Sequence, residues 1–185
     1  VDFLFPSMLA LAVMSIGLVS LGIRTAYERN YGVLKRLGAT PLGRGRLLGA
    51  KILSVLAVEV LQVIILGSVA FFFGWRPTGA FAIALIALLL GTAVFASLGL
   101  LIAGTFRAET TLGLANGLYI LFILLGGVAW PLDRLPGPIA LVGILLPSNA
   151  LATALRASLA PEPSWPFVQL GALVLWTALI LLVAR

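Results

Sequence analysis

The sequence contains no cysteine and no histidine among its 185 residues. The absence of cysteine excludes disulfides and thiol nucleophiles, and the absence of both removes the usual zinc ligands and the imidazole base. Charge is scarce as well, because 10% of the residues are charged, where a soluble domain carries roughly 25%. Hydrophobic residues make up 62% of the chain, so the composition indicates an integral membrane protein.

The charge that is present lies mostly in one segment, residues 24–51, between two apolar runs. This basic loop holds seven of the chain's twelve basic residues and a single acid, Glu28. Because lysine and arginine beside membrane spans are retained in the cytoplasm, we expect the basic loop to be cytoplasmic. The net charge of +6 comes mostly from this loop, so it indicates membrane topology and not binding to nucleic acid.

Five apolar runs are long enough to span a bilayer, and they predict an all-α membrane protein, a polytopic helical bundle. A helix rises 1.5 Å per residue, so about 20 residues cross a hydrocarbon core of about 30 Å. The expected spans cover residues 3–23, 47–73, 80–106, 111–129 and 167–184.

Residues 131–164 differ from these spans because they hold most of the ten prolines and carry no net charge. The two apolar pieces in this segment, 139–146 and 149–159, are too short to cross a membrane. We therefore expect short re-entrant or interfacial helices on the outer side. Trp130 and Trp165 are expected to mark the outer interface at either end, as tryptophan does in other membrane proteins.

Five spans place the start of the chain outside and its end, Arg185, inside. A membrane chain that starts outside without a signal peptide is unusual. We therefore expect one further span upstream, making six in all. Residues 1–185 are then expected to form a single transmembrane domain without its first span.

Two polar residues, Glu59 and Gln62, lie one turn apart within the expected second span. An ionisable residue at that depth is costly and usually faces the bundle interior or a water-filled cavity. Glu59 is expected to serve either a substrate pathway or a structural hydrogen bond. The second interpretation pairs it with a helix that carries Asn116 or a serine, and the sequence leaves both open.

The basic loop has an apolar face at helical spacing. The members of this face are Tyr27, Tyr31, Leu34 and Leu37. Gly38 and Pro41 follow, which is a common pattern for the end of a helix. The spacing predicts a short amphipathic helix over residues 28–37, either lying on anionic headgroups or docking a cytoplasmic partner.

Residues 28–41, Glu-Arg-Asn-Tyr-Gly-Val-Leu-Lys-Arg-Leu-Gly-Ala-Thr-Pro, resemble a loop of type-2 ATP-binding-cassette (ABC) transporter permeases. That family has Glu-Arg, then Gly-aliphatic, then Leu and Thr-Pro or Ser-Pro after its second span. Residues 98–109 are similar to its Leu-Gly-Leu-Leu-Ile run, and residues 126–136 to its Gly-Val-Phe-Phe-Pro and Leu-Pro pattern. The resemblance covers nearly the whole chain in the right order.

The resemblance implies that residues 28–37 are the coupling helix, which docks into a cleft of a separate ATPase subunit. The implied coupling residues are Glu28, Arg29, Tyr31, Leu34, Lys35 and Leu37. Asn30 and Tyr31 depart from the family, in which many members carry glutamate or arginine and a small residue. The residues left as candidates for the pathway or for bundle contacts are Glu59, Gln62 and Asn116.

The family also implies the partners: two copies of the ABC ATPase, a second permease copy in a homodimer or heterodimer, and the bilayer of a prokaryotic cell membrane. ATP and magnesium are expected on the ATPase, with no cofactor or metal on this chain. Residues 38–45 superficially resemble a P-loop, but Arg44 replaces its lysine and Gly45 its magnesium-binding hydroxyl. We therefore expect transport without ATP hydrolysis by this chain.

The family exports drugs, lipids and other amphiphiles, which makes export of such a compound the leading hypothesis. Two other classes of function stay open. One is a proton-coupled secondary carrier centred on Glu59, and the other is an intramembrane enzyme, although no pair of catalytic groups is suggested by spacing.

Overall fold

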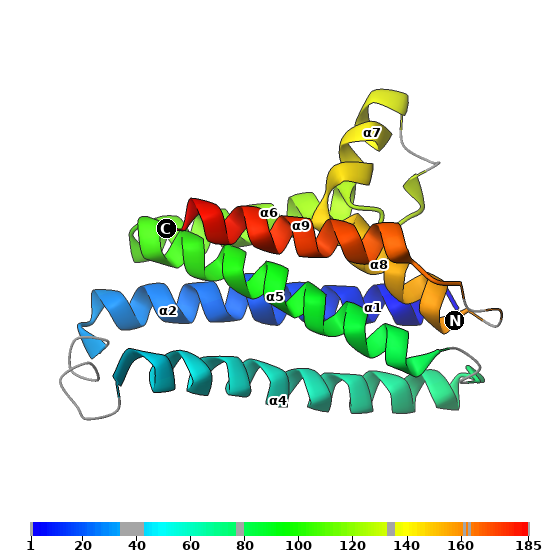
Figure 1. The fold of residues 1–185 in the computed structure, drawn as a ribbon, viewed down its shortest axis with the longest axis horizontal. Coiled ribbons are helices and arrows are strands. Elements are labelled where there is room, and N and C mark those ends of the chain that lie inside the picture. Colours follow the sequence, from blue (N-terminus) through cyan, green and yellow to red (C-terminus); the bar gives the residue numbers. More distant parts are fainter. Residues whose placement is uncertain are drawn as a thin grey trace.

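A computed structural model of the chain describes residues 2–33, 43–76, 80–132, 136–160, 162 and 164–184. The regular elements within these ranges are all helices, drawn in Figure 1. They are α1 (Leu4–Met14), the π-helix η1 (Ser15–Ser20), α2 (Leu21–Asn30), α4 (Gly43–Phe72), α5 (Phe81–Thr105), α6 (Ala108–Leu125), α7 (Gly137–Leu145), α8 (Pro147–Leu159) and α9 (Phe167–Val183).

The long helices lie side by side, which confirms the predicted polytopic helical bundle (Figure 1). The elements α1, η1 and α2 form one continuous helix, Leu4–Asn30, which we call the first helix. This helix, α4, α5 and α6 are each long and apolar enough to cross a membrane. The fifth expected span corresponds to α9, whose 17 residues stand at the short end of the spanning range of about 17–25.

The segments that the sequence assigns to opposite sides of the membrane lie at opposite ends of the bundle. The end of the first helix, the start of α4, the turn between α5 and α6 and the end of α9 share one end, which we call the basic end (left in Figure 1). The start of the first helix, the end of α4, the start of α5 and α8 lie toward the other end (Figure 1). The alternation of the helices therefore agrees with the expected topology.

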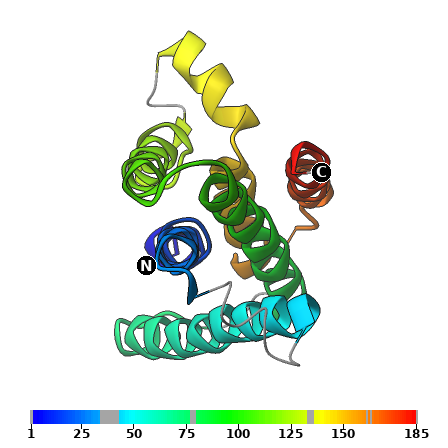
Figure 2. The same ribbon diagram turned by 90° about the vertical axis from the view of Figure 1, so that its left-hand side faces the viewer.

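The bundle is organised around α5, which packs against the first helix, α8 and α9 (Figure 2). Its inward side chains include Val94 and Phe95, neither of which has any exposed surface. The Phe95 ring meets Phe122 of α6 edge to face, with the ring centroids 5.8 Å apart. By contrast, α4 lies at the margin and exposes most of its apolar side chains, as expected for a helix that faces lipid.

The two short helices of the proline-rich segment have different environments. They meet at an angle of 80°, the geometry of a broken span or a re-entrant loop. In α8, Leu151 and Leu155 are completely buried, so this helix packs inside the bundle. In α7, Leu141 and Leu145 are exposed, and the helix projects from the bundle (Figure 1).

A partly buried arginine of α8, Arg156, holds the start of the first helix. The Nη2 atom of Arg156 donates to Ser7 Oγ at 2.8 Å and to the carbonyl oxygen of Gly127 at 2.7 Å. The guanidinium also lies over the ring of Phe3, 4.0 Å from its centroid. These contacts join α1, α8 and the residues after α6 in a region of low dielectric, where hydrogen bonds to a charged group are strong.

Close contact between the first helix and α5 depends on glycine. A Cβ atom added at Gly99 would lie 2.5 Å from the carbonyl oxygen of Gly17, and one added at Gly22 would lie 3.1 Å from the carbonyl oxygen of Gly99. The neighbouring atoms belong to backbone, which cannot rotate away as a side chain does. Small residues allow membrane helices to approach this closely. Gly17 lies in η1, where the Leu21 N–H bonds to the Ile16 carbonyl five residues back.

We expect Gly99→Ala to destabilise the bundle by about 1–3 kcal/mol, the usual cost of overpacking. Gly104→Ala is the matched control, because it lies on the same helix with nothing within 4 Å of an added Cβ. Alanine is favoured over glycine within a helix by about 1 kcal/mol, so the control should retain or raise the melting temperature. Thermal unfolding in detergent measures both variants, and equal melting temperatures would contradict the assigned contact.

Candidate functional site

The basic end collects three of the candidate residues, Glu28, Arg29 and Tyr31. The last two turns of α2 supply Arg24, Glu28 and Arg29, and the first turns of α4 supply Lys51. Tyr31 follows α2 directly. The turn between α5 and α6 lies against the same group, because Arg29 bonds to it.

Glu28 joins the first helix to α4. One of its carboxylate oxygens accepts a hydrogen bond from Arg24 Nε at 2.9 Å, one turn back on the same helix. The other oxygen accepts from Lys51 Nζ, which also donates to Thr25 Oγ1 at 3.0 Å. The Lys51 side chain is 14% exposed and that of Glu28 is 20% exposed, so this pair is screened far less by solvent than a surface ion pair.

Arg29 joins the first helix to the end of α5. Its two terminal nitrogens donate to the carbonyl oxygens of Gly104 and Phe106. The last carbonyls of a helix have no partner within the helix, and they form the negative end of its dipole. A guanidinium placed there donates hydrogen bonds to these carbonyls and brings a positive charge to the negative end of the dipole. Glu28 and Arg29 therefore make contacts within the chain, although the family resemblance predicts that both residues contact an ATPase.

The predicted helix over residues 28–37 is wrong at its start. The first helix continues to Asn30 and is followed by a turn at Tyr31 and Gly32. Gly32 has a φ of 70°, in the left-handed region that glycine adopts readily and that commonly ends a helix. Val33 is the last residue described before Gly43. Leu34, Lys35 and Leu37 lie outside the described residues.

Tyr31 is an exposed aromatic residue whose ring packs against a second tyrosine. Its ring lies 5.9 Å from that of Tyr27 between centroids, and Tyr27 packs on the buried alanines 26, 103 and 108. Tyr31 itself is 70% exposed. An exposed aromatic ring whose position is set by packing beneath it suits a protein interface, because little side-chain freedom is lost on binding.

Glu59 faces the bundle interior, as we predicted from the free-energy cost of exposing a carboxyl group to lipid. It is 5% exposed, and its Oε2 atom accepts a hydrogen bond from Thr92 Oγ1 of α5 at 2.6 Å. Of the two expected partner helices, the one that carries Asn116 is not used, because the Asn116 amide donates at 2.9 Å to the Leu112 carbonyl of its own helix. The partner helix is α5, which carries a serine, Ser97, although the bond comes from its threonine. Thr92 is a polar residue within an apolar run, and that was the signal that sequence reasoning missed.

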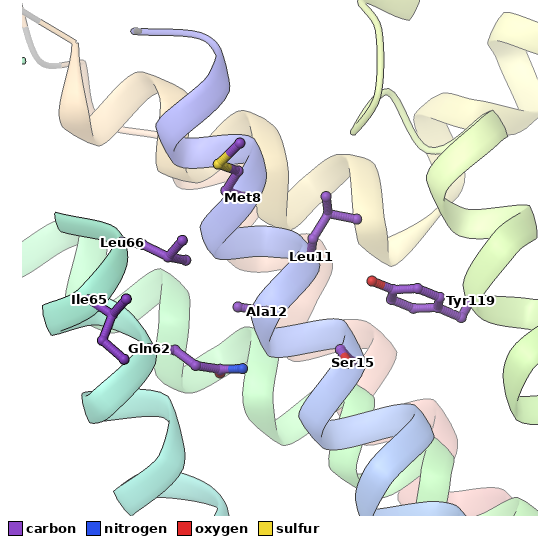
Figure 3. Close-up of a pocket in the computed structure, with 8 residues that line it drawn as sticks. All are labelled: Met8, Leu11, Ala12, Ser15, Gln62, Ile65, Leu66 and Tyr119. Atoms are coloured by element: carbon purple, nitrogen blue, oxygen red, sulfur yellow. The ribbon is translucent and has the colours of Figure 1, made fainter. Parts of the chain in front are cut away.

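Gln62, one turn from Glu59, lines an open groove between the first helix, α4 and α6 (Figure 3). The groove has a volume of about 370 Å³. Its walls are Met8, Leu11, Ala12, Ser15, Gln62, Ile65, Leu66 and Tyr119. Gln62 extends from α4 toward Ser15, and Tyr119 approaches from the opposite side (Figure 3).

The polar groups of this groove lie where a span is otherwise apolar. The Oε1 atom of Gln62 is buried and has no hydrogen-bond partner among the described residues. The side chains of Ser15, Gln62 and Tyr119 line the groove and give its apolar wall hydrogen-bonding groups. Tyr119, the tyrosine of α6, was not identified from sequence. The groove can therefore accept an apolar molecule that carries a small polar group.

The bond between Thr92 and Glu59 makes a prediction about stability. Thr92→Val removes the donor and leaves the carboxyl group buried, which should destabilise the protein by about 1–3 kcal/mol. Glu59→Gln keeps an acceptor and should preserve folding. Thr105→Val is the control, since the Thr105 hydroxyl bonds only to carbonyls of its own helix among the described residues. Thermal unfolding in detergent compares the three, and equal behaviour of the two threonine variants would refute the role of Thr92.

Comparison with known proteins agrees with this arrangement. The family described as "ABC-2 type transporter" matches residues 2–159 of the chain. A Bacillus subtilis (strain 168) protein named "Putative transport permease YvfS" is 28% identical over 186 residues, which cover 96% of this chain and 69% of that protein. Because the family match extends over most of the bundle, including the basic end and the groove, the chain belongs to the ABC-2 type transporter family and is a permease of that type.

Proposed function

We propose that this permease exports a drug, lipid or other amphiphile across a prokaryotic cell membrane, using ATP hydrolysed by separate ATPase subunits. The observation that carries the proposal is the set of bonds at the basic end. There the first helix is bonded to α4 through Glu28 and to the end of α5 through Arg29. A force applied just beyond Asn30 acts on several spans at once.

The connection to the ATPase follows from this geometry. A transporter without its own nucleotide site receives work through a surface that is rigidly connected to its spans. Tyr31 is exposed directly after the first helix, and Gly32 turns the chain there into the rest of the basic loop. Tyr31, with Leu34, Lys35 and Leu37 in the following segment, would contact the ATPase. Glu28 and Arg29 would transmit the displacement to the bundle.

Two permease copies and two ATPases are proposed for the assembly. Gly113 and Gly117 have the spacing that allows close packing of membrane helices. In this chain, nothing lies within 4 Å of a Cβ added at either position. This face of α6 therefore supports contact with a second copy. ATP and magnesium would bind to the ATPase subunits.

The nature of the cargo is inferred from the groove. Its volume of about 370 Å³ falls within the roughly 300–1,000 Å³ typical of small-molecule sites. Its wall is mostly aliphatic, with polar groups from Ser15, Gln62 and Tyr119. That composition suits an amphiphile with a hydrogen-bonding group. Outward transport is what the family leads us to expect.

A proton-coupled carrier is less well supported. It would depend on Glu59, whose carboxylate bonds to Thr92 and which does not line the groove. Glu59→Gln separates the two functions. Retained ATP-driven transport assigns Glu59 a structural role, whereas transport that is lost although folding and ATPase binding persist favours the carrier.

The docking surface is tested by Tyr31→Ala combined with Leu34→Ala. We expect the permease to insert and fold, but to bind its ATPase at least about tenfold more weakly, because an interface aromatic commonly contributes this much. Pull-down at equal permease levels measures the loss. The control is Phe72→Ala with Phe73→Ala, which removes two exposed rings at the opposite end. Equal recovery of ATPase by both double variants would remove the coupling assignment.

Arg29→Ala tests transmission apart from docking. This substitution frees the end of α5 while leaving Tyr31 in place. We expect ATPase recovery close to that of the wild type, with less cargo moved per ATP hydrolysed. Reconstituted vesicles allow both rates to be measured on one sample, and an unchanged ratio would show that Arg29 has no part in coupling.

The topology is tested by single cysteines, which are easily interpreted in a chain that has none. A cysteine at Glu162 should react with an impermeant reagent added outside the cell. A cysteine at Arg46 should react only after the membrane is opened, because basic residues beside spans stay in the cytoplasm. The reverse pattern would overturn the proposed orientation.

A further inference from the structure

A second opening lies between the first helix and α4, closer to the basic end than the groove of Figure 3. It has a volume of about 90 Å³. The residues that line it, which we call the basic crevice, are Ile16, Ser20, Leu21, Arg24, Ser54, Val55 and Val58. The function proposed above makes no use of it.

The lining of the basic crevice changes from charged to apolar along the helices. On the first helix, Arg24 stands nearest the basic end, Ser20 one turn deeper and Ile16 a further turn deeper. Arg24 and Ile16 are thus about 12 Å apart along the axis. On α4, which runs the other way, Ser54 is nearer the basic end than Val58. On each wall the outermost lining residue, Arg24 or Ser54, is polar and the innermost, Ile16 or Val58, is aliphatic, with Leu21 and Val55 between them.

The mouth of the crevice is suited to an anion. Arg24 uses its Nε atom to bond Glu28 at 2.9 Å, and its terminal nitrogens make no hydrogen bond to a described residue. Glu28 is also bound by Lys51, so the two cations outnumber the one carboxylate. Guanidinium groups bind phosphate in a fork geometry, and the Ser20 hydroxyl supplies a further donor. The Ser54 hydroxyl lies at the same mouth and donates to the Lys51 carbonyl of its own helix at 2.8 Å.

The volume of the basic crevice and its aliphatic lining residues indicate which kind of anion it binds. A volume of about 90 Å³ is well below the roughly 300 Å³ at which sites for whole small molecules begin. The crevice can hold a head group, while the attached chains remain in the bilayer beside the exposed Val58. Basic pockets between spans are known to bind acidic lipid head groups. A soluble phosphate would leave the aliphatic floor unused.

We propose that the basic crevice binds the phosphate of an anionic phospholipid from the adjoining leaflet. Arg24 and Ser20 hold the phosphate beside Ser54, and an acyl chain runs along the exposed Val58. Because Arg24 also bonds Glu28, the bound lipid stabilises the same network that joins the first helix to α4. This effect on coupling rests on the proposed function, whereas the binding of lipid does not.

The test uses the purified full-length chain in detergent and counts bound lipids by native mass spectrometry. Phosphatidylglycerol and phosphatidylcholine with identical acyl chains are the probes. We expect the wild type to retain about tenfold more phosphatidylglycerol, because both lipids carry the phosphate but the choline of phosphatidylcholine adds a positive charge that Arg24 repels. Arg24→Gln should abolish this preference. Ser54→Leu, which fills the crevice and keeps every charge, should abolish it as well.

Two variants act as controls. Ser68→Leu makes the same substitution on α4 outside the crevice. Arg76→Gln removes an arginine at the opposite end of the bundle, where it lies over Phe71. Both should keep the preference for phosphatidylglycerol.

The proposal is overturned if Arg24→Gln and Ser54→Leu retain the wild-type preference, or if the control variants lose it equally. Displacement of the lipid by inorganic phosphate would also overturn it, since that identifies a site for soluble anions. The ATPase pull-down is run on the same variants. Lipid binding that persists without any ATPase partner would leave this inference intact while the transport function failed.

Discussion

The backbones of the first helix and α5 touch at Gly17 and Gly99, and the functional groups depend on this contact. With any larger residue at Gly99, the two helices would separate, because the atoms opposite an added Cβ are carbonyl oxygens. The separation would be felt at the basic end, where Arg29 reaches the final carbonyls of α5. Close helix packing in the membrane interior is therefore what permits an electrostatic bond at its surface.

The first helix is held by an arginine at each end. One arginine belongs to the first helix and donates to another element, whereas the other belongs to α8 and donates to the first helix. At the basic end, its own Arg29 donates to the carbonyls that finish α5. At the other end, Arg156 of α8 donates to Ser7 on the first helix. Backbone carbonyls that a membrane cannot solvate accept hydrogen bonds at both places. The arrangement makes the first helix the element through which the two ends of the bundle are connected.

The spans and the inward orientation of Glu59 were predictable, because both follow from the cost of exposing polar groups to lipid. The partner of Glu59 was not, since the choice of Thr92 over Asn116 depends on how α4 and α5 are rotated against each other. The end of the first helix at Asn30 was also missed. The apolar spacing of Tyr27 and Tyr31 continues past Gly32, and only the backbone angle of that glycine shows the break. The burial of α8 was not predictable either. Its length also fits an interfacial helix, and its packing against the other helices cannot be read from the sequence.

The π-helical segment η1 has a consequence for the orientation of everything that follows it on the first helix. An α-helix turns about 100° per residue, so each surplus residue in η1 rotates α2 by that angle relative to an unbroken helix. The hydrogen bond from Leu21 to Ile16 spans five residues and marks this surplus. Deleting one residue between Ser15 and Ser20 would leave the composition and hydropathy of the span almost unchanged, yet it would turn Arg29 away from α5. The rotation of α2 about its axis, and with it the direction in which the charged side chains of the basic end point, is thus set by an irregularity in the middle of the first helix.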